Sequence, residues 1–434
     1  MAGPALRCTP RLPACSKARP GEDPLSDDDP EPTRPRLTGL LRNPAIPARL
    51  LRRLVDEQND QVRQYIPWRP EWTPEQFEEL ATHPDPEVRA QVARAQHITS
   101  QQRARFVEDP AGRVVAAMVQ GPEWITYSHW DDPEPVLPEW AYRRARQRVP
   151  YVEVFFDTPW LPAEWLARLL PPGKTTAPVE PAALTRDEAE AMVADGNSYR
   201  RRLAAQDPRL PADLVRRLAG DADHGVRLAV SMRPELTEEQ RAAIDHRIEP
   251  ETRVSPPAWV VQTTDRDVQH AIARSAHPGL RRGLAGNQHL DPALIPVLAA
   301  DDDHAVRLLL CESQRDVPFE LLLATYLEAT VMTRFRLLTH PAFDRDGLAL
   351  RLAGHPDPAA RALARLDPRP PAGLIERLSH DEHPQVRQSV AAHRLLSPAR
   401  VLALFAAPET TGQAAASPHL PVAVMEQILT DAAP

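Results

Sequence analysis

The chain has 434 residues, of which 42% are hydrophobic and 26% charged, and its formal net charge is −8. This composition is close to that of folded soluble domains and excludes a wholly disordered chain, and the negative charge disfavours a general nucleic-acid binder. No apolar run approaches the roughly 20 residues of a membrane span, so we expect no membrane segment. Three cysteines are too few for a disulfide framework, which favours a reducing cytoplasm.

Residues 1–38 carry eight prolines and no apolar periodicity. A basic block is followed by an acidic one, and the segment has too little apolar surface to offset the entropy of ordering. We therefore predict a disordered Pro-rich tail. Its two cysteines, Cys8 and Cys15, have no nearby histidine, so we interpret them as loose thiols that hold no metal.

A repeat begins at about Gly39, and its clearest copy is LATHPDPEVRAQVA from Leu80 to Ala93. Similar text starts at Leu54, Leu218, Leu298, Leu352 and Leu378. We name the position before the recurring arginine the slot. It falls, mostly 26 or 27 residues apart within each run, at Val62, Val88, Val114, Arg200, Val226, Thr252, Leu280, Val306, Thr333, Ala360 and Val386. Self-similarity at such a period is the signature of a repeat architecture.

Each unit reads as two short helices. The first helix opens near a proline, as at Pro74, Pro211 and Pro292, and proline is tolerated in a first turn. The second follows an acidic turn and places the slot and the apolar residue four positions later on one face. Because one such pair cannot bury its own apolar face, units must stack on their neighbours. The sequence therefore predicts an all-α fold, a solenoid of units of about 26 residues.

The pattern weakens in residues 125–197, where aromatic side chains gather and a Pro-rich linker follows. We thus expect N-terminal repeats in 39–124, irregular aromatic-rich units in 125–197, and C-terminal repeats in 198–434 that end in a degenerate cap. Trp and Tyr dominate binding hot spots, so the aromatic region is the candidate partner site. Its candidate residues are Trp130, Trp140, Tyr142, Trp160 and Trp165. The alternative is an aromatic core that fills an irregular junction.

The L-A-x-x-P-D-P-E-V-R text at Leu80 and the L-A-x-x-P-D-P-A-A-R text at Leu352 resemble the leucine-rich-repeat variant family and, more distantly, HEAT-like repeats. The resemblance covers roughly residues 39–430. It implies a right-handed superhelix of short helices and a role in interactions. Some members of the family hold an iron–sulfur centre on an N-terminal cysteine cluster. Only Cys8 and Cys15 precede the repeats here, so no cofactor is expected.

The arginine after the slot recurs through the repeats and has two interpretations. A ladder of arginines could bind phosphates or acidic peptides. Alternatively, each arginine pairs with an acidic turn, and because acids accompany nearly every arginine we favour this structural role. The residues assigned to the structural ladder are Arg63, Arg89, Arg227, Arg307, Arg361 and Arg387.

No catalytic triad, thiolate nucleophile or metal-ligand motif stands out from the repeat background. Histidines recur at the turns, for example His224 and His304, but equivalent positions stack one unit apart and do not converge on a metal. We expect a non-enzymatic cytoplasmic scaffold that binds a protein or peptide along its extended surface. The alternatives are a nucleic-acid binder that uses the arginine ladder, and a repeat-fold enzyme with its site in residues 127–165.

Overall fold

The protein is described from a computed structural model, which defines residues 33–57, 62–122, 136–148, 184–248 and 254–432. Every regular element in these ranges is an α-helix or a 3-10 helix, so the described chain is all-α, as predicted. The linker and much of the aromatic region lie outside the described residues.

The helices before the break at residues 149–183 are short and alternate along the chain. They are α1 (Thr33–Arg42), α2 (Ala48–Glu57), η1 (Ile66–Trp68), α4 (Pro74–Ala81), α5 (Pro86–Ala93), α6 (Ser100–Ala104), η2 (Arg105–Glu108), α7 (Gly112–Gln120) and α8 (Glu139–Arg148).

The helices after the break fall into two runs. The first run is α11 (Arg186–Val193), α12 (Ser198–Gln206), α13 (Ala212–Ala219), α14 (His224–Ser231), α15 (Glu238–Ala242), α16 (Ala258–Val261), α17 (Arg266–Ala273), α18 (Pro278–Ala285), η4 (Pro292–Leu294), α19 (Ile295–Ala299) and α20 (His304–Ser313). The second run is α21 (Phe319–Glu328), η5 (Met332–Thr339), α22 (Leu348–Leu352), α23 (Pro358–Leu363), η6 (Ala364–Leu366), α24 (Leu374–Leu378), α25 (Pro384–Val390), α26 (Pro398–Ala406), α27 (Thr411–Ala415) and α28 (Val422–Asp431).

Local hydrogen bonds explain where these helices start. The acidic turn residue is the N-cap of the second helix of a unit, as where Asp85 accepts from the backbone N–H of Glu87. First helices start at a threonine capping box, as at Thr73 with Gln76, or directly after a proline. The punctuation visible in the sequence thus sets the length of each helix.

The apolar periodicity marks the buried face of the second helices. Val88 and Val92 are fully buried in α5, and Leu80 of α4 covers them from the first helix. The slot is buried in unit after unit, at Val62, Val88, Val114, Val226, Leu280, Val306, Ala360 and Val386. Arg200, at the slot of α12, is exposed instead. Burial of this face against neighbouring helices supplies the hydrophobic stabilisation of the array.

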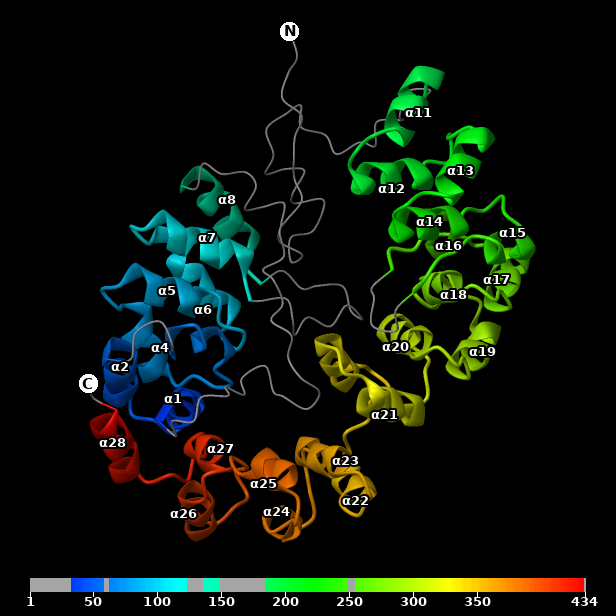
Figure 1. Ribbon diagram of the computed structural model, residues 1–434. Coiled ribbons are helices and arrows are strands. Elements are labelled where there is room, and N and C mark those ends of the chain that lie inside the picture. Colours follow the sequence, from blue (N-terminus) through cyan, green and yellow to red (C-terminus); the bar gives the residue numbers. More distant parts are fainter. Residues whose placement is uncertain (1–32, 58–61, 123–135, 149–183, 249–253, 433–434) are drawn as a thin grey trace.

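Successive second helices pack on one another, so α5 contacts α7, α12 contacts α14, α18 contacts α20, and α23 contacts α25. The result is an arc that runs from α8 at one end to α11 at the other (Figure 1). In the lower part of the arc, α23, α25 and α27 lie on the inner side and α22, α24 and α26 on the outer side (Figure 1).

The two ends of the chain meet in the middle of the arc. Helix α1 packs against α27 and α28, and one core cluster extends from Leu40 through Val88 to Met425. Where the sequence pattern suggested a tail up to residue 38, α1 begins at Thr33 and buries Leu37. The expected C-terminal cap likewise does not end the array, because α1 covers α27.

Candidate functional site

Arg89, which follows the slot Val88, shows the geometry of the arginine ladder. Its Nε and Nη2 atoms donate to both carboxylate oxygens of Asp109, at 2.7 and 2.9 Å. Its Nη1 atom donates to the carbonyl oxygens of His83 and Pro84 in the preceding turn. Asp109 also accepts from the backbone N–H of Ala111. One guanidinium therefore joins the turn of its own unit to the turn of the next unit.

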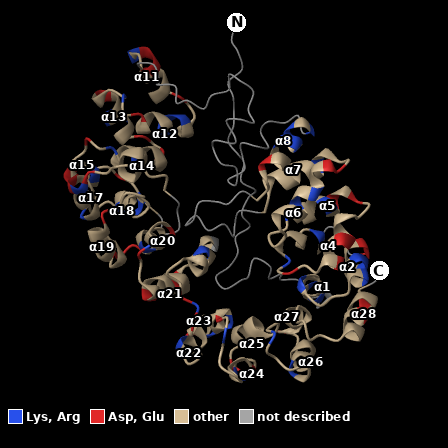
Figure 2. Cartoon of the chain, turned by 180° about the vertical axis from the view of Figure 1, so that it is seen from behind, with Lys and Arg blue, Asp and Glu red and all other residues tan. Residues whose placement is uncertain are grey.

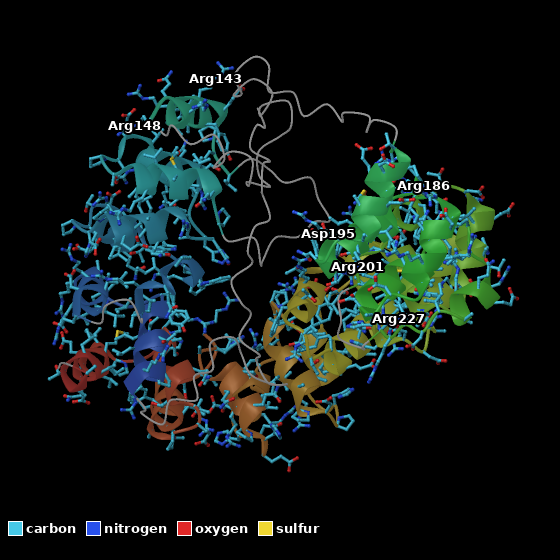
Figure 3. The ribbon with its side chains drawn as sticks, turned by 45° about the horizontal axis from the view of Figure 1, so that its top comes forward. Arg143, Arg148, Arg186, Asp195, Arg201 and Arg227 are labelled. Atoms are coloured by element: carbon cyan, nitrogen blue, oxygen red, sulfur yellow. The ribbon has the colours of Figure 1, made fainter. Side chains whose placement is uncertain are left out.

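The same arrangement recurs along the arc. The acid lies 20 to 22 residues after the arginine in the pairs Arg63–Asp85, Arg89–Asp109, Arg201–Asp221, Arg281–Asp301, Arg307–Glu328, Arg361–Asp381 and Arg387–Glu409. Arg227 pairs with Asp245, 18 residues on. A carbonyl six residues before the arginine accepts from it in most units, as at Asp195 for Arg201. Figure 3 shows Asp195, Arg201 and Arg227 on neighbouring helices of one end of the arc.

These contacts hold both partners in their charged forms. The hydrogen bonds from Arg201 lower the pKa of the Asp221 carboxyl, and those from Arg361 lower the pKa of Asp381 in the same way. The pKa of the Arg281 guanidinium is raised, first by its hydrogen bonds to Asp301. Bidentate arginine–carboxylate pairs are the stronger kind of charged hydrogen bond. The ladder arginines are therefore engaged within the chain.

A second set of polar contacts joins the units and was not anticipated from the sequence. At the end of a second helix, two carbonyl oxygens two residues apart accept from one side chain of a neighbouring unit; we call them the carbonyl pair. Arg233 donates to the pair at Ala205 and Asp207, at 2.8 Å each. Gln314 donates to the pair at Ala285 and Asn287, at 3.0 and 2.9 Å.

Two further arginines fill carbonyl pairs from the interior. Arg69 donates to Leu41 and Asn43, and Arg103 donates to Ala93 and Ala95. Both guanidiniums are buried, and burial lowers the pKa of each to about 10. The donors lie before a proline in some units and at the start of a first helix in others. The recurrence is visible only once the carbonyls are seen.

The candidate aromatic site is described only in part. Trp140, on α8, is 56% exposed, whereas Tyr142 on the same helix is fully buried. Helical geometry explains the difference, because Ala141, Tyr142 and Ala145 form the inward face of α8. A partner can thus reach Trp140 but not Tyr142. Trp130, Trp160 and Trp165 lie outside the described residues.

The turn histidines are dispersed along the arc. His83 contacts Asp56 at 2.8 Å, and His304 contacts Glu328 at 3.3 Å, each with a single carboxylate. Within the described ranges, no group of three or more His, Cys, Asp or Glu side chains is placed to hold a metal ion. Cys311 is buried beside Thr325, and burial raises the pKa of its thiol to about 11.

Basic and acidic residues occur along the whole arc, and neither sign is confined to one part of it (Figure 2). Among the described helices, none combines the length and apolar character needed to cross a membrane. No protein-family model matches the chain, and a comparison with curated proteins finds no match either.

Proposed function

We propose that this chain is a non-enzymatic, cytoplasmic scaffold that binds a protein or peptide partner along an extended surface. In this proposal the helix pairs form a right-handed α-solenoid of units of about 26 residues, similar to the leucine-rich-repeat variant and HEAT-like families. The proposal rests on the residues that recur, since each of them has a structural partner within the chain.

The observation that carries the proposal is the engagement of the ladder arginines. A phosphate-binding arginine needs free donors, since affinity for nucleic acid comes from neutralised phosphates. Arg89 instead spends its donors on Asp109 and on two carbonyl oxygens. Arg361 does the same with Asp381, His355 and Pro356. This favours a structural ladder over the nucleic-acid alternative.

The surface left for a partner consists of single exposed apolar side chains on successive units. Trp140 on α8 and Leu350 on α22 are more than half exposed, at 56% and 71%. A tryptophan at a contact contributes more than other residue types, because its large rigid ring loses little conformational entropy on binding. Trp140 is therefore our candidate contact residue, and Leu350 serves as a matched exposed control.

The proposal is tested by capture from a nuclease-treated lysate of the native host, with the purified full-length chain as bait. We expect a saturable protein partner that the wild type and Leu350→Ala retain and Trp140→Ala retains less well. Partner identity is read by mass spectrometry. Recovery of nucleic acid from an untreated lysate, with no saturable protein partner after nuclease treatment, would favour the alternative function.

A further inference from the structure

Two helices at opposite ends of the chain each lack the partner that the repeat requires. Helix α28 follows Pro421 as the first helix α13 follows Pro211, and no second helix follows it in the described chain. Helix α1 ends before the Asn43–Pro44 step. That step matches Arg233–Pro234 after the second helix α14, and no described first helix precedes α1.

Helix α1 packs on α27 as one second helix packs on the next. The crossing is close because two glycines meet there. A Cβ atom on Gly39 would overlap the Gly412 carbonyl oxygen and lie 2.9 Å from the Ala415 Cβ. A Cβ atom on Gly412 would lie 2.8 Å from the Cβ of Pro35. The pair of glycines thus sets the distance between the two helices.

The polar contact at this junction repeats the one found inside the array. Helix α27 ends in a carbonyl pair at Ala415 and Ser417, and Asn43 donates its Nδ2 atom to both, at 2.9 and 2.6 Å. Gln314 makes the equivalent contact with Ala285 and Asn287. Asn43 therefore occupies the position that the next unit of the array would fill, although it lies more than 370 residues earlier in the sequence.

Helix α28 completes the unit from the other side. It contacts both α1 and α2 and buries Met425 and Leu429 in the core that contains Leu40. At its surface, Glu426 accepts from Arg49 at 2.6 Å. The core is therefore continuous from the last repeats to the first.

We infer that α28 and α1 together form one repeat unit, with its first helix from the C-terminal end and its second from the N-terminal end. This split unit is a clasp that holds residues 33–122 onto residues 398–432. The contacts on both faces of α1 are those of an interior repeat, so the two ends of the chain open and close together. The inference does not depend on which partner the scaffold binds.

The test compares Gly39→Ala with the matched control Gly112→Ala by hydrogen exchange in the full-length chain. Alanine favours helix over glycine at both positions, and a Cβ on Gly112 meets nothing within 4 Å. We expect Gly39→Ala to lower protection about tenfold or more in α1, α27 and α28 together, with α12 and α14 unchanged. Gly112→Ala should leave all five helices as protected as in the wild type.

A second variant guards against wholesale unfolding by Gly39→Ala. Asn43→Ala removes the clasp contact, and Gln314→Ala removes its counterpart inside the array. Asn43→Ala should raise exchange in both α1 and α27, while Gln314→Ala should act on α18 and α20. Rapid exchange of α1 in the wild type beside a protected α27 would overturn the inference. So would a dimer, seen by light scattering, whose α1 protection falls on dilution, because α1 would then complete a unit in another copy.

Discussion

Replacing Arg89 by methionine tests whether the arginine ladder holds the units together. Methionine keeps much of the apolar stem but removes the donors, so it isolates the charged contacts. Arg89 donates twice to Asp109 and once each to His83 and Pro84. The side chains are only 11% and 7% exposed, so the carboxylate of Asp109 would stay largely buried without its counter-charge.

Removing one member of a buried ion pair costs about 3–5 kcal/mol, because the remaining charge has no compensation. Solvent reaches part of this pair, and Asp109 keeps its bond from the Ala111 backbone N–H, so we expect a loss of about 3 kcal/mol. The matched control is Arg113→Met. Arg113 lies 3.8 Å from Glu87 on the surface and is 63% exposed, so its loss should cost under about 1 kcal/mol.

The free energy of unfolding is measured by urea denaturation followed by far-ultraviolet circular dichroism, with the slope checked for each variant. Adding Asp109→Asn to Arg89→Met should recover part of the loss, because the stranded charge is removed while a cap to Ala111 persists. If Arg89→Met costs no more than Arg113→Met, the ladder does not stabilise the array and its arginines are free for another role.

Three further outcomes follow from buried groups. His277 is stacked on His246 with ring centroids 4.5 Å apart, and burial, aided by the charges of His246 and Arg241, lowers its pKa to about 3. It is therefore neutral when folded but takes up a proton when unfolded below pH 6.5, so stability falls as the pH drops. The His277 contribution is about 2 kcal/mol between pH 6.5 and 5, measured as the difference in urea midpoints between wild type and His277→Phe; an equal pH dependence in both would contradict this. Val88→Asp, at a fully buried slot, should cost several kcal/mol through an unpaired buried charge, and unchanged stability would refute the assignment of the slot to the core. In a variant with Cys8 and Cys15 replaced by serine, Cys311 should react with a thiol reagent only as the chain unfolds, because its thiol is buried with a raised pKa; rapid reaction with the folded chain would disagree with its placement.

The all-α fold followed from the sequence because its signals are local. The slot at Val88, the cap at Asp85 and the first-turn proline Pro86 lie within a few residues of each other, and their spacing alone specifies a short amphipathic helix. Acidic residues near each arginine also made an ion-pair ladder readable. The precise partner was less accessible, since Arg89 crosses to the next unit at Asp109.

The junction of the two chain ends was not predictable in the same way. Equivalent units present equivalent surfaces, so nothing in the period says that α1 stacks on α27. The contact depends on Gly39, Gly412 and Asn43, three residues that look ordinary when read locally. Exposure was equally hidden in the aromatic region. Trp140 and Tyr142 are two residues apart, yet only the first faces solvent, because their helix presents different sides to the core.

Binding to a polyanion tests the central claim most directly, because the claim assigns the recurring arginines to structure and the extended surface to a protein partner. The purified chain is applied to heparin and to duplex DNA at about 50 mM salt, where phosphate-driven binding is strong. The account predicts no retention of the wild type, and none for Arg361→Met. Retention that falls steeply with salt and is lost in Arg361→Met would contradict the account and identify the ladder as a binding surface.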